Sequence, residues 1–167
     1  KSAYSVGREA GTVSSRLNQA FQYVFSTVKR IRTETAIGQS PVSVAYTSVR
    51  LARQIFTDFE SKTTLLIGAG ETIELVAKHL RDQGMGEVIV ANRTLSRARD
   101  AVQNFASKII LLSDVPEYLY KADILISSTA SQLPILGKGV VEDAIKKRRK
   151  KPMLLIDLAV PRDIESQ

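Results

Sequence analysis

The feature that most constrains the fold is a short apolar strand that runs into two glycines and then into a helix. Residues 63–67 carry no charge, Gly68 and Gly70 follow, and apolar side chains then recur at helical spacing over residues 71–82. An uncharged strand of this kind is typical of a parallel sheet covered by helices, and glycines in such a turn let a phosphate approach the backbone. The junction therefore predicts a nucleotide-binding βαβ unit whose helix begins with amides free to bind that phosphate.

The glycine pattern matches the dinucleotide-binding fingerprint only in part, because Ile73 stands where the third small residue is expected. The context supports the motif, since a second apolar strand over residues 87–91 follows directly after Gly84 and Gly86. A glycine-containing turn without a ligand is the alternative. The predicted phosphate-binding residues are Gly68, Ala69, Gly70, Glu71, Thr72 and Ile73.

The residues after the second strand predict which dinucleotide binds. Sites for NAD place a carboxylate there, which contacts the ribose 2′-hydroxyl. This chain instead has Asn92, Arg93 and Thr94, with Arg97 one turn further and no acidic residue before Asp100. Cations and hydrogen-bond donors would attract a 2′-phosphate, so the predicted cofactor is NADP. The alternative is that the two arginines are solvated residues at the start of a helix.

Downstream, strands continue to alternate with helices, which predicts an α/β fold with a Rossmann-like, doubly wound parallel sheet. Helices are expected at residues 95–105, 115–120 and 140–147, and strands at 108–112, 122–126 and 153–157. Ligands of such sheets lie across the carboxyl ends of the strands. One crevice should therefore collect the turns at residues 68–73, 92–94, 127–131 and 157–162.

Two of these turns suggest where the nicotinamide end of the cofactor lies. Ser128 and Thr129 should lie near the nicotinamide ribose, because they end the strand across the switch point from the first strand. Ala159 and Val160 are candidates for the nicotinamide itself, as a small apolar floor. The alternatives are that the hydroxyl groups cap a turn and that Pro161 ends the strand.

Two helices, expected at residues 14–37 and 42–59, precede the first strand. The first presents a long apolar face without an evident partner. We therefore expect residues 1–38 to be one or two linker helices from a neighbouring domain and residues 39–167 to be the nucleotide-binding domain. The 167 residues are enough for one sizeable core, and the apolar runs are shorter than the ~20 residues that cross a bilayer, so a cytoplasmic protein without a membrane contact is expected.

Five motifs occur together and in order along this chain. They are RTETAIG from Arg32, GAGETIELVAKHL from Gly68, ANRT from Ala91, SSTAS from Ser127 and IDLAVPRD from Ile156. With these motifs the chain, from about residue 13 onward, resembles the glutamyl-tRNA reductase family. That family also carries isoleucine at position 73, so the departure from the general fingerprint agrees with the resemblance.

The resemblance implies a reaction. A cysteine takes the glutamyl group from glutamyl-tRNA as a thioester, and NADPH reduces it to glutamate-1-semialdehyde for tetrapyrrole (porphyrin) biosynthesis. The family's cysteine lies in an amino-terminal domain, and its homodimer forms through a carboxy-terminal one. This chain has no cysteine, so we expect a monomeric, inactive NADP-binding part without catalytic residues. A downstream aminomutase is a further candidate partner of the parent protein.

Several remaining features are expected to do little chemistry. Without cysteine and with one histidine, the chain is not expected to bind a metal. His79 lies within the helix over residues 71–82, where a structural or surface role is expected. The net charge of +7 and the basic run at residues 146–151 would ordinarily suggest nucleic-acid binding. No aromatic residue interrupts the run, so we expect a solvated helix end, with salt-sensitive phosphate binding as the alternative.

Two other functions remain open. One is an NADP-dependent enzyme similar to shikimate dehydrogenase, whose cofactor domain also resembles the Asn-Arg-Thr strand end. The other is a non-catalytic module that binds RNA or a protein partner. A preference for NADPH over NADH would separate the two enzymes from the module. A cysteine-bearing domain in the parent protein would separate the two enzymes from each other.

Overall fold

The computed structural model describes residues 2–34, 44–102, 105–149 and 151–165. The chain divides into two compact units, Lys1–Pro41 and Val42–Gln167. The domain boundary predicted between residues 38 and 39 falls within residues 35–43, outside the described residues.

The first unit consists of helix α1 (Ser2–Glu9), which the sequence did not indicate, and helix α2 (Ser15–Glu34). Aromatic rings join the two helices, because the ring of Tyr4 lies 5.0 Å from that of Phe21 and 5.3 Å from that of Phe25. The Tyr4 hydroxyl also donates to Asn18 and accepts a hydrogen bond from Gln22. The predicted apolar face of α2 is therefore covered only in part.

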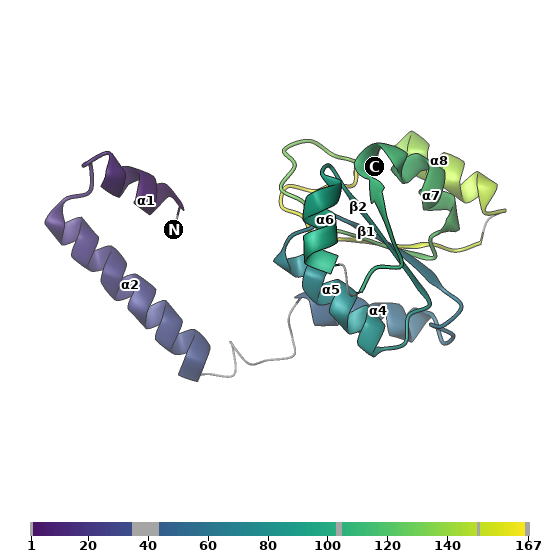
Figure 1. The fold of residues 1–167 in the computed structure, drawn as a ribbon, viewed down its shortest axis with the longest axis horizontal. Helices are drawn as coiled ribbons and strands as arrows, with labels where there is room; N and C mark the ends of the chain where they lie inside the picture. Colours follow the sequence, from purple (N-terminus) through teal and green to yellow (C-terminus); the bar gives the residue numbers. More distant parts are fainter. Residues whose placement is uncertain (1, 35–43, 103–104, 150, 166–167) are drawn as a thin grey trace. The chain divides into compact units, whose positions relative to one another are not determined.

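The second unit is a five-stranded parallel sheet (Figure 1). Its strands are β1 (Thr63–Ile67), β2 (Glu87–Asn92), β3 (Lys108–Leu111), β4 (Ile124–Ser127) and β5 (Leu154–Asp157). They lie in the order β3-β2-β1-β4-β5, so β1 is central and pairs with both β2 and β4. Strands β2 and β3 are added on one side of β1, and β4 and β5 on the other. This switch point between β1 and β4 is where a ligand crevice is expected.

Helices cover both faces of the sheet. Helices α4 (Val44–Ile55), α5 (Glu71–Asp82) and α6 (Leu95–Val102) pack on one face, and α7 (Val115–Tyr118) and α8 (Lys138–Lys147) pack on the other. The one-turn helices η1 (Leu112–Asp114) and η2 (Leu119–Lys121) flank α7. Within β1, Leu66 faces the first group of helices, and Leu65 and Ile67 face the second. The predicted doubly wound α/β fold is thereby confirmed.

Element boundaries differ from the prediction where turns compete with helices. Helix α4 ends at Ile55 instead of residue 59, because the chain turns and inserts Phe59 into the core with 2% of its surface exposed. The Phe59 carbonyl then accepts hydrogen bonds from Lys62 and Gly86. Helix α8 begins two residues earlier than predicted, after Gly137. Helix α6 ends at residue 102, and residues 103–104 lie outside the described residues.

None of the described helices combines the length and apolar character that crossing a bilayer requires.

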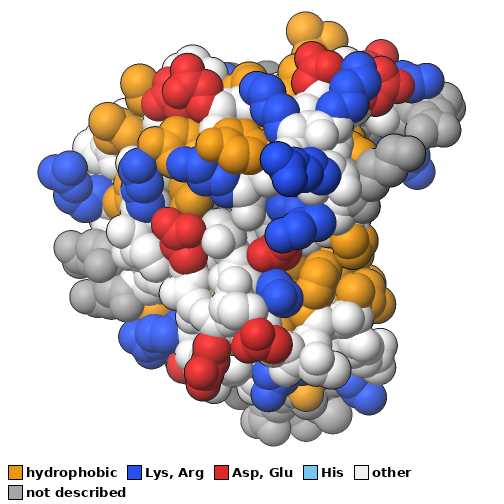
Figure 2. Space-filling model, turned by 90° about the vertical axis from the view of Figure 1, so that its right-hand side faces the viewer, with side chains coloured by type: hydrophobic (Ala, Val, Ile, Leu, Met, Phe, Trp, Pro, Cys, Tyr) orange, Lys and Arg blue, Asp and Glu red, His pale blue; other side chains and the backbone are white. Residues whose placement is uncertain are grey.

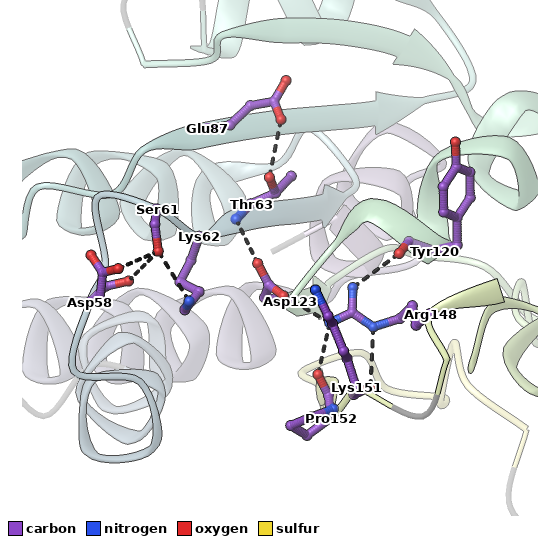
Figure 3. Close-up of polar contacts among 10 residues, drawn as sticks. All are labelled: Asp58, Ser61, Lys62, Thr63, Glu87, Tyr120, Asp123, Arg148, Lys151 and Pro152. Atoms are coloured by element: carbon purple, nitrogen blue, oxygen red, sulfur yellow. Dashed lines mark hydrogen bonds and ion pairs between the residues drawn. The ribbon is translucent and has the colours of Figure 1, made fainter. Parts of the chain in front are cut away.

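The basic run is solvated only in part, and the expectation is wrong for Arg148. Its side chain is 4% exposed and lies 2.8 Å from an oxygen of Asp123, which precedes β4 (Figure 3). The same guanidinium donates to the backbone carbonyls of Tyr120, Lys151 and Pro152. The second Asp123 oxygen accepts a hydrogen bond from the backbone amide of Thr63 at the start of β1. Arg148 therefore joins the end of α8 to the amino ends of two central strands.

Figure 2 shows one face of the molecule on which lysine and arginine side chains are frequent, with acidic and hydrophobic side chains among them. Charges of one sign thus do not form an uninterrupted surface on this face. One exposed pair of opposite charge is Lys146 with Asp143, whose charged atoms lie 3.3 Å apart. Lys146 is thus exposed, whereas Arg148, two residues further along the chain, has a buried side chain.

Replacing Arg148 by methionine should lower the free energy of unfolding by about 3 kcal/mol, because the Asp123 carboxylate loses its buried cation. Urea unfolding followed by circular dichroism measures this change. The matched control is Lys146→Ala, which removes the exposed pair and should cost no more than about 0.5 kcal/mol. Equal effects of the two substitutions would contradict the structural role of Arg148.

Candidate functional site

A cavity of about 770 Å³ opens at the carboxyl ends of β1, β2 and β4. Three of the four turns expected to converge meet there, and the turn at residues 157–162 does not line it. The lining residues are Gly68, Ala69, Gly70, Ala91, Asn92, Arg93, Thr94, Arg97, Leu112, Ser128, Thr129, Ala130 and Ile135. The cavity therefore lies at the switch point of the sheet, where parallel α/β domains bind ligands.

Gly68 brings the first and fourth strands into close contact at the floor of the cavity. Its φ is +116°, and a Cβ atom placed on it would lie 2.4 Å from the carbonyl oxygen of Ser128. The same hypothetical atom would lie 3.4 Å from the Ile73 side chain, which is fully buried. Ile73 thus fills the space between α5 and the sheet, which explains how the helix packs without a third small residue.

The start of helix α5 carries no side-chain cap. Gly70 is the residue that precedes the helix, and no side chain caps the first backbone amides. A Cβ atom on Gly70 would meet nothing within 4 Å, so the backbone lies open to the cavity here. Glu71 is exposed and, with Thr72 and Ile73, forms the first turn without lining the cavity. Unpaired amides at a helix start attract phosphate through hydrogen bonds and the helix dipole.

The end of β2 supplies positive charge. Arg93, Thr94 and Arg97 are exposed and line the cavity, while the amide group of Asn92 donates to the Thr94 carbonyl at 3.0 Å. None of the described residues that line the cavity is acidic. An anion with several charges would thus find two guanidinium groups and no carboxylate among the described lining residues.

Two apolar lining residues, Leu112 and Ile135, were not predicted. Leu112 follows β3, so the rule that ligands lie at the carboxyl ends of strands could have indicated it. Ile135 lies in the connection between β4 and α8, where no periodic pattern marks a residue as lining a site. Both side chains are partly buried against the core and give the cavity apolar surface beside its charged residues.

The end of β4 forms another wall of the cavity. Thr129 is engaged within the protein, because its hydroxyl donates to Asp163 at 2.6 Å and accepts from the amide of Ser131 at 3.1 Å. Its role near the ribose therefore depends on the backbone or on an exchange of partners. The Ser128 hydroxyl makes no hydrogen bond to another residue in the described part of the chain. Ser128 is thus the better placed of the two hydroxyl groups to contact a ligand.

The residues predicted to contact the nicotinamide lie outside the cavity lining. Ala159 is 7% exposed, and its amide donates to Asp157 at 3.0 Å, whereas Val160 is 93% exposed. His79 lies on the helix face that meets α4, where its ring is 5.7 Å from that of Tyr46. Among the described residues, the cavity lining holds two guanidinium groups, hydroxyl groups and backbone of the glycine turn, and it includes neither a histidine nor a cysteine.

Comparisons with known proteins agree with this geometry. The family model described as Shikimate / quinate 5-dehydrogenase matches residues 50–167. A glutamyl-tRNA reductase from Saccharophagus degradans is 63% identical over all of this chain, which covers 39% of that protein. The structure of a glutamyl-tRNA reductase from Methanopyrus kandleri matches with a TM-score of 0.69 and 34% identity, covering 99% of this chain and 42% of that one.

A further solved structure shows the same fold. The nucleotide-binding domain of a glutamyl-tRNA reductase from Thermoplasma volcanium matches 72% of this chain and 80% of that chain, with a TM-score of 0.57 and 22% identity. The chain spans about 40% of the length of the curated relatives that it matches. Together the family model and the nucleotide-binding neighbours support a nicotinamide cofactor for the cavity.

Replacing Gly68 by alanine should lower the free energy of unfolding by about 2 kcal/mol or more, because the new Cβ atom would collide with the Ser128 carbonyl at a strained φ. Thermal unfolding followed by circular dichroism measures the effect. The control is Gly70→Ala, whose Cβ atom has open space and should change stability by no more than about 0.5 kcal/mol. A Gly68→Ala variant as stable as the control would refute the close contact.

Proposed function

This chain belongs to the family whose model is described as Shikimate / quinate 5-dehydrogenase, and because it is also similar to glutamyl-tRNA reductases over its whole length, we propose that it is the NADPH-binding part of such a reductase. One observation carries the proposal. The cavity at the carboxyl ends of β1, β2 and β4 combines an uncapped helix start, two arginines and no acidic lining residue. A dinucleotide with a diphosphate and a third phosphate offers the matching charges.

The pyrophosphate binds at the glycine turn and the first amides of α5. The backbone around Gly70 faces open space, and the amides of Glu71, Thr72 and Ile73 have no capping side chain. Glu71 is exposed, so its carboxylate can point into solvent, away from the phosphates. The positive end of the helix dipole then acts on the phosphate without competition from a side chain.

The adenosine end of the cofactor lies at the end of β2. Arg93 and Arg97 supply charge for the 2′-phosphate, and Thr94 adds a hydroxyl group. Leu112 gives an apolar surface on which the adenine ring can pack. This arrangement supports NADP over NAD, because a site for NAD would present a carboxylate to the free 2′-hydroxyl.

The nicotinamide end lies on the other side of the glycine turn, beside Ser128, Thr129 and Ala130. The Ser128 hydroxyl is available to the ribose, and Ala130 is too small to obstruct the ring. In the assigned reaction the bound cofactor would supply hydride. Ala159 and Val160 lie outside the cavity lining, so a contact with the nicotinamide would need the segment after β5 to move or another part of the parent protein to complete the site.

The parent protein, we propose, reduces glutamyl-tRNA to glutamate-1-semialdehyde in tetrapyrrole biosynthesis. A cysteine outside this chain attacks the ester that joins glutamate to tRNA and forms a thioester. The tRNA would leave with its terminal ribose hydroxyl, and hydride supplied by NADPH would then displace the thiolate, which gives the aldehyde, the free cysteine and NADP+. This chain contributes the binding of the cofactor, since it has no cysteine of its own.

The proposed partners follow from that reaction. Glutamyl-tRNA is the substrate of the parent, an aminomutase is a candidate acceptor of the labile aldehyde, and the parent is a cytoplasmic homodimer. A shikimate dehydrogenase-like enzyme is the less favoured assignment. The family model covers only residues 50–167, whereas the match to a glutamyl-tRNA reductase also extends over the first 49 residues.

We expect this chain to bind NADPH at least about tenfold more tightly than NADH, because two guanidinium groups line the cavity. Replacing Arg93 by glutamate should remove most of this preference. Isothermal titration calorimetry at moderate salt measures both dissociation constants. The control is Arg99→Glu, an exposed arginine of α6 that does not line the cavity and should leave the preference unchanged. An unchanged preference in the Arg93 variant would overturn its assignment to the 2′-phosphate.

We also expect the chain by itself to bind the cofactor without reducing the substrate. Glutamyl-tRNA with labelled glutamate should leave no label on the protein, because a thioester needs a thiol and the chain has none. Denaturing electrophoresis without reducing agent detects the label. A full-length relative that contains the cysteine is the positive control, and label on this chain would show that our assignment of the nucleophile is wrong.

A further inference from the structure

Asp163 is a buried carboxylate just outside the cofactor cavity, in the motif that follows β5. None of its surface is exposed, and it does not line the cavity. One carboxylate oxygen accepts hydrogen bonds from the Ser127 hydroxyl at 2.5 Å and from the Thr129 amide at 2.9 Å. The other accepts from the Thr129 hydroxyl at 2.6 Å. Three donors from the end of β4 therefore converge on this one side chain.

The backbone of Asp163 binds further along the connection between β4 and α8. Its carbonyl accepts hydrogen bonds from the amides of Ile135, at 2.7 Å, and Leu136, at 3.0 Å. Thr129 and Ile135 both line the cavity. One residue thus fixes both ends of the segment over residues 129–135 and, with it, one wall of the cavity.

Asp163 is itself held in place by the segment that carries it. Asp157, at the end of β5, accepts hydrogen bonds from the amides of Ala159, at 3.0 Å, and Ile164, at 2.9 Å. Leu136 and Ile164 also form an isolated parallel bridge. The loop between β5 and Asp163 is therefore closed on itself and joined to the connection after β4.

A buried carboxylate is costly unless donors surround it, so this arrangement tolerates only small displacements of its partners. The adenosine side of the cavity, with Arg93, Thr94 and Arg97, has no hydrogen bond to Asp163 among the contacts of the described residues. Movement at Asp163 should accordingly reach only the side that Ser128 and Thr129 form.

We propose that Asp163 is a positioning residue that sets the affinity of the cavity for the nicotinamide half of the cofactor, acting through Ser128 and Thr129. This inference rests on the proposed function of the cavity. Asp163 holds the Ser127 hydroxyl and the Thr129 amide, on either side of Ser128, so that the Ser128 hydroxyl meets the ribose while the Asp163 carboxylate stays outside the site. The adenosine half binds independently of this clamp.

The test compares two ligands on the whole chain and on an Asp163→Asn variant. NADPH occupies both halves of the site, whereas 2′,5′-ADP carries only the adenosine half with its 2′-phosphate. The carbonyl oxygen of asparagine can accept from two of the three donors, but its NH2 group replaces the oxygen that accepts from the third, so one of these hydrogen bonds is lost. We expect the dissociation constant of NADPH to rise about tenfold and that of 2′,5′-ADP to change by less than about twofold.

Two more variants keep the test independent of folding. Ser127→Ala removes one donor to Asp163 and does not change a residue that lines the cavity. It should raise the dissociation constant of NADPH by about threefold and leave that of 2′,5′-ADP unchanged. Glu165→Gln is the matched control, because it neutralises an exposed acid in the same segment whose contact is the Lys138 amide. It should change neither affinity, and thermal unfolding shows which variants are folded.

The outcomes separate the two proposals. If the original chain binds neither ligand, the proposed function fails, and the role of Asp163 fails with it. If the original chain binds both ligands and the Asp163→Asn and Ser127→Ala variants bind NADPH as tightly as the original chain does, only the positioning role is overturned. An equal loss for both ligands would also overturn it, since a general structural defect would weaken both halves of the site alike.

Discussion

The close approach of Gly68 to the Ser128 carbonyl is the constraint on which the cavity depends. A side chain at Gly68 would collide with that oxygen, so the ends of β1 and β4 can meet only at a glycine. The Gly68 amide also donates to Ala91 at the end of β2, and the Ser128 amide donates to Ile67. Three strands are thereby joined at one point, and the turns that follow them, with Gly70, Arg93 and Ser128, lie around it.

A buried arginine and two exposed, cavity-lining arginines lie at opposite ends of the sheet. At the amino ends, the buried pair of Arg148 and Asp123 joins α8 to β1 and β4 (Figure 3). At the carboxyl ends, Arg93 and Arg97 remain exposed and line the cavity. The same residue type thus serves two purposes, because Arg148 is surrounded by acceptors of the protein, whereas the other two face a space that an anion can enter.

Much of the fold and part of the site could be predicted, since their signals are local. The uncharged run of β1, the glycines after it and the helical period of α5 lie within 20 residues of one another. Ile73 looked unfavourable by the general fingerprint and is fully buried against Gly68. Arg148 and Asp163 could not be assigned, because their partners lie 25 and 34–36 residues away, and no local pattern connects such positions.

The sequence by itself determined the alternation of strands and helices in the second unit, the glycine turn and the cations at the end of β2. Periodicity and backbone chemistry are properties of neighbouring residues, so they can be read along the chain. Only the tertiary structure decided that Arg148 is buried, that Thr129 is bound by Asp163 and that Val160 lies outside the cavity. Burial and hydrogen-bond partners depend on which distant segments meet, and that is settled only when the sheet assembles.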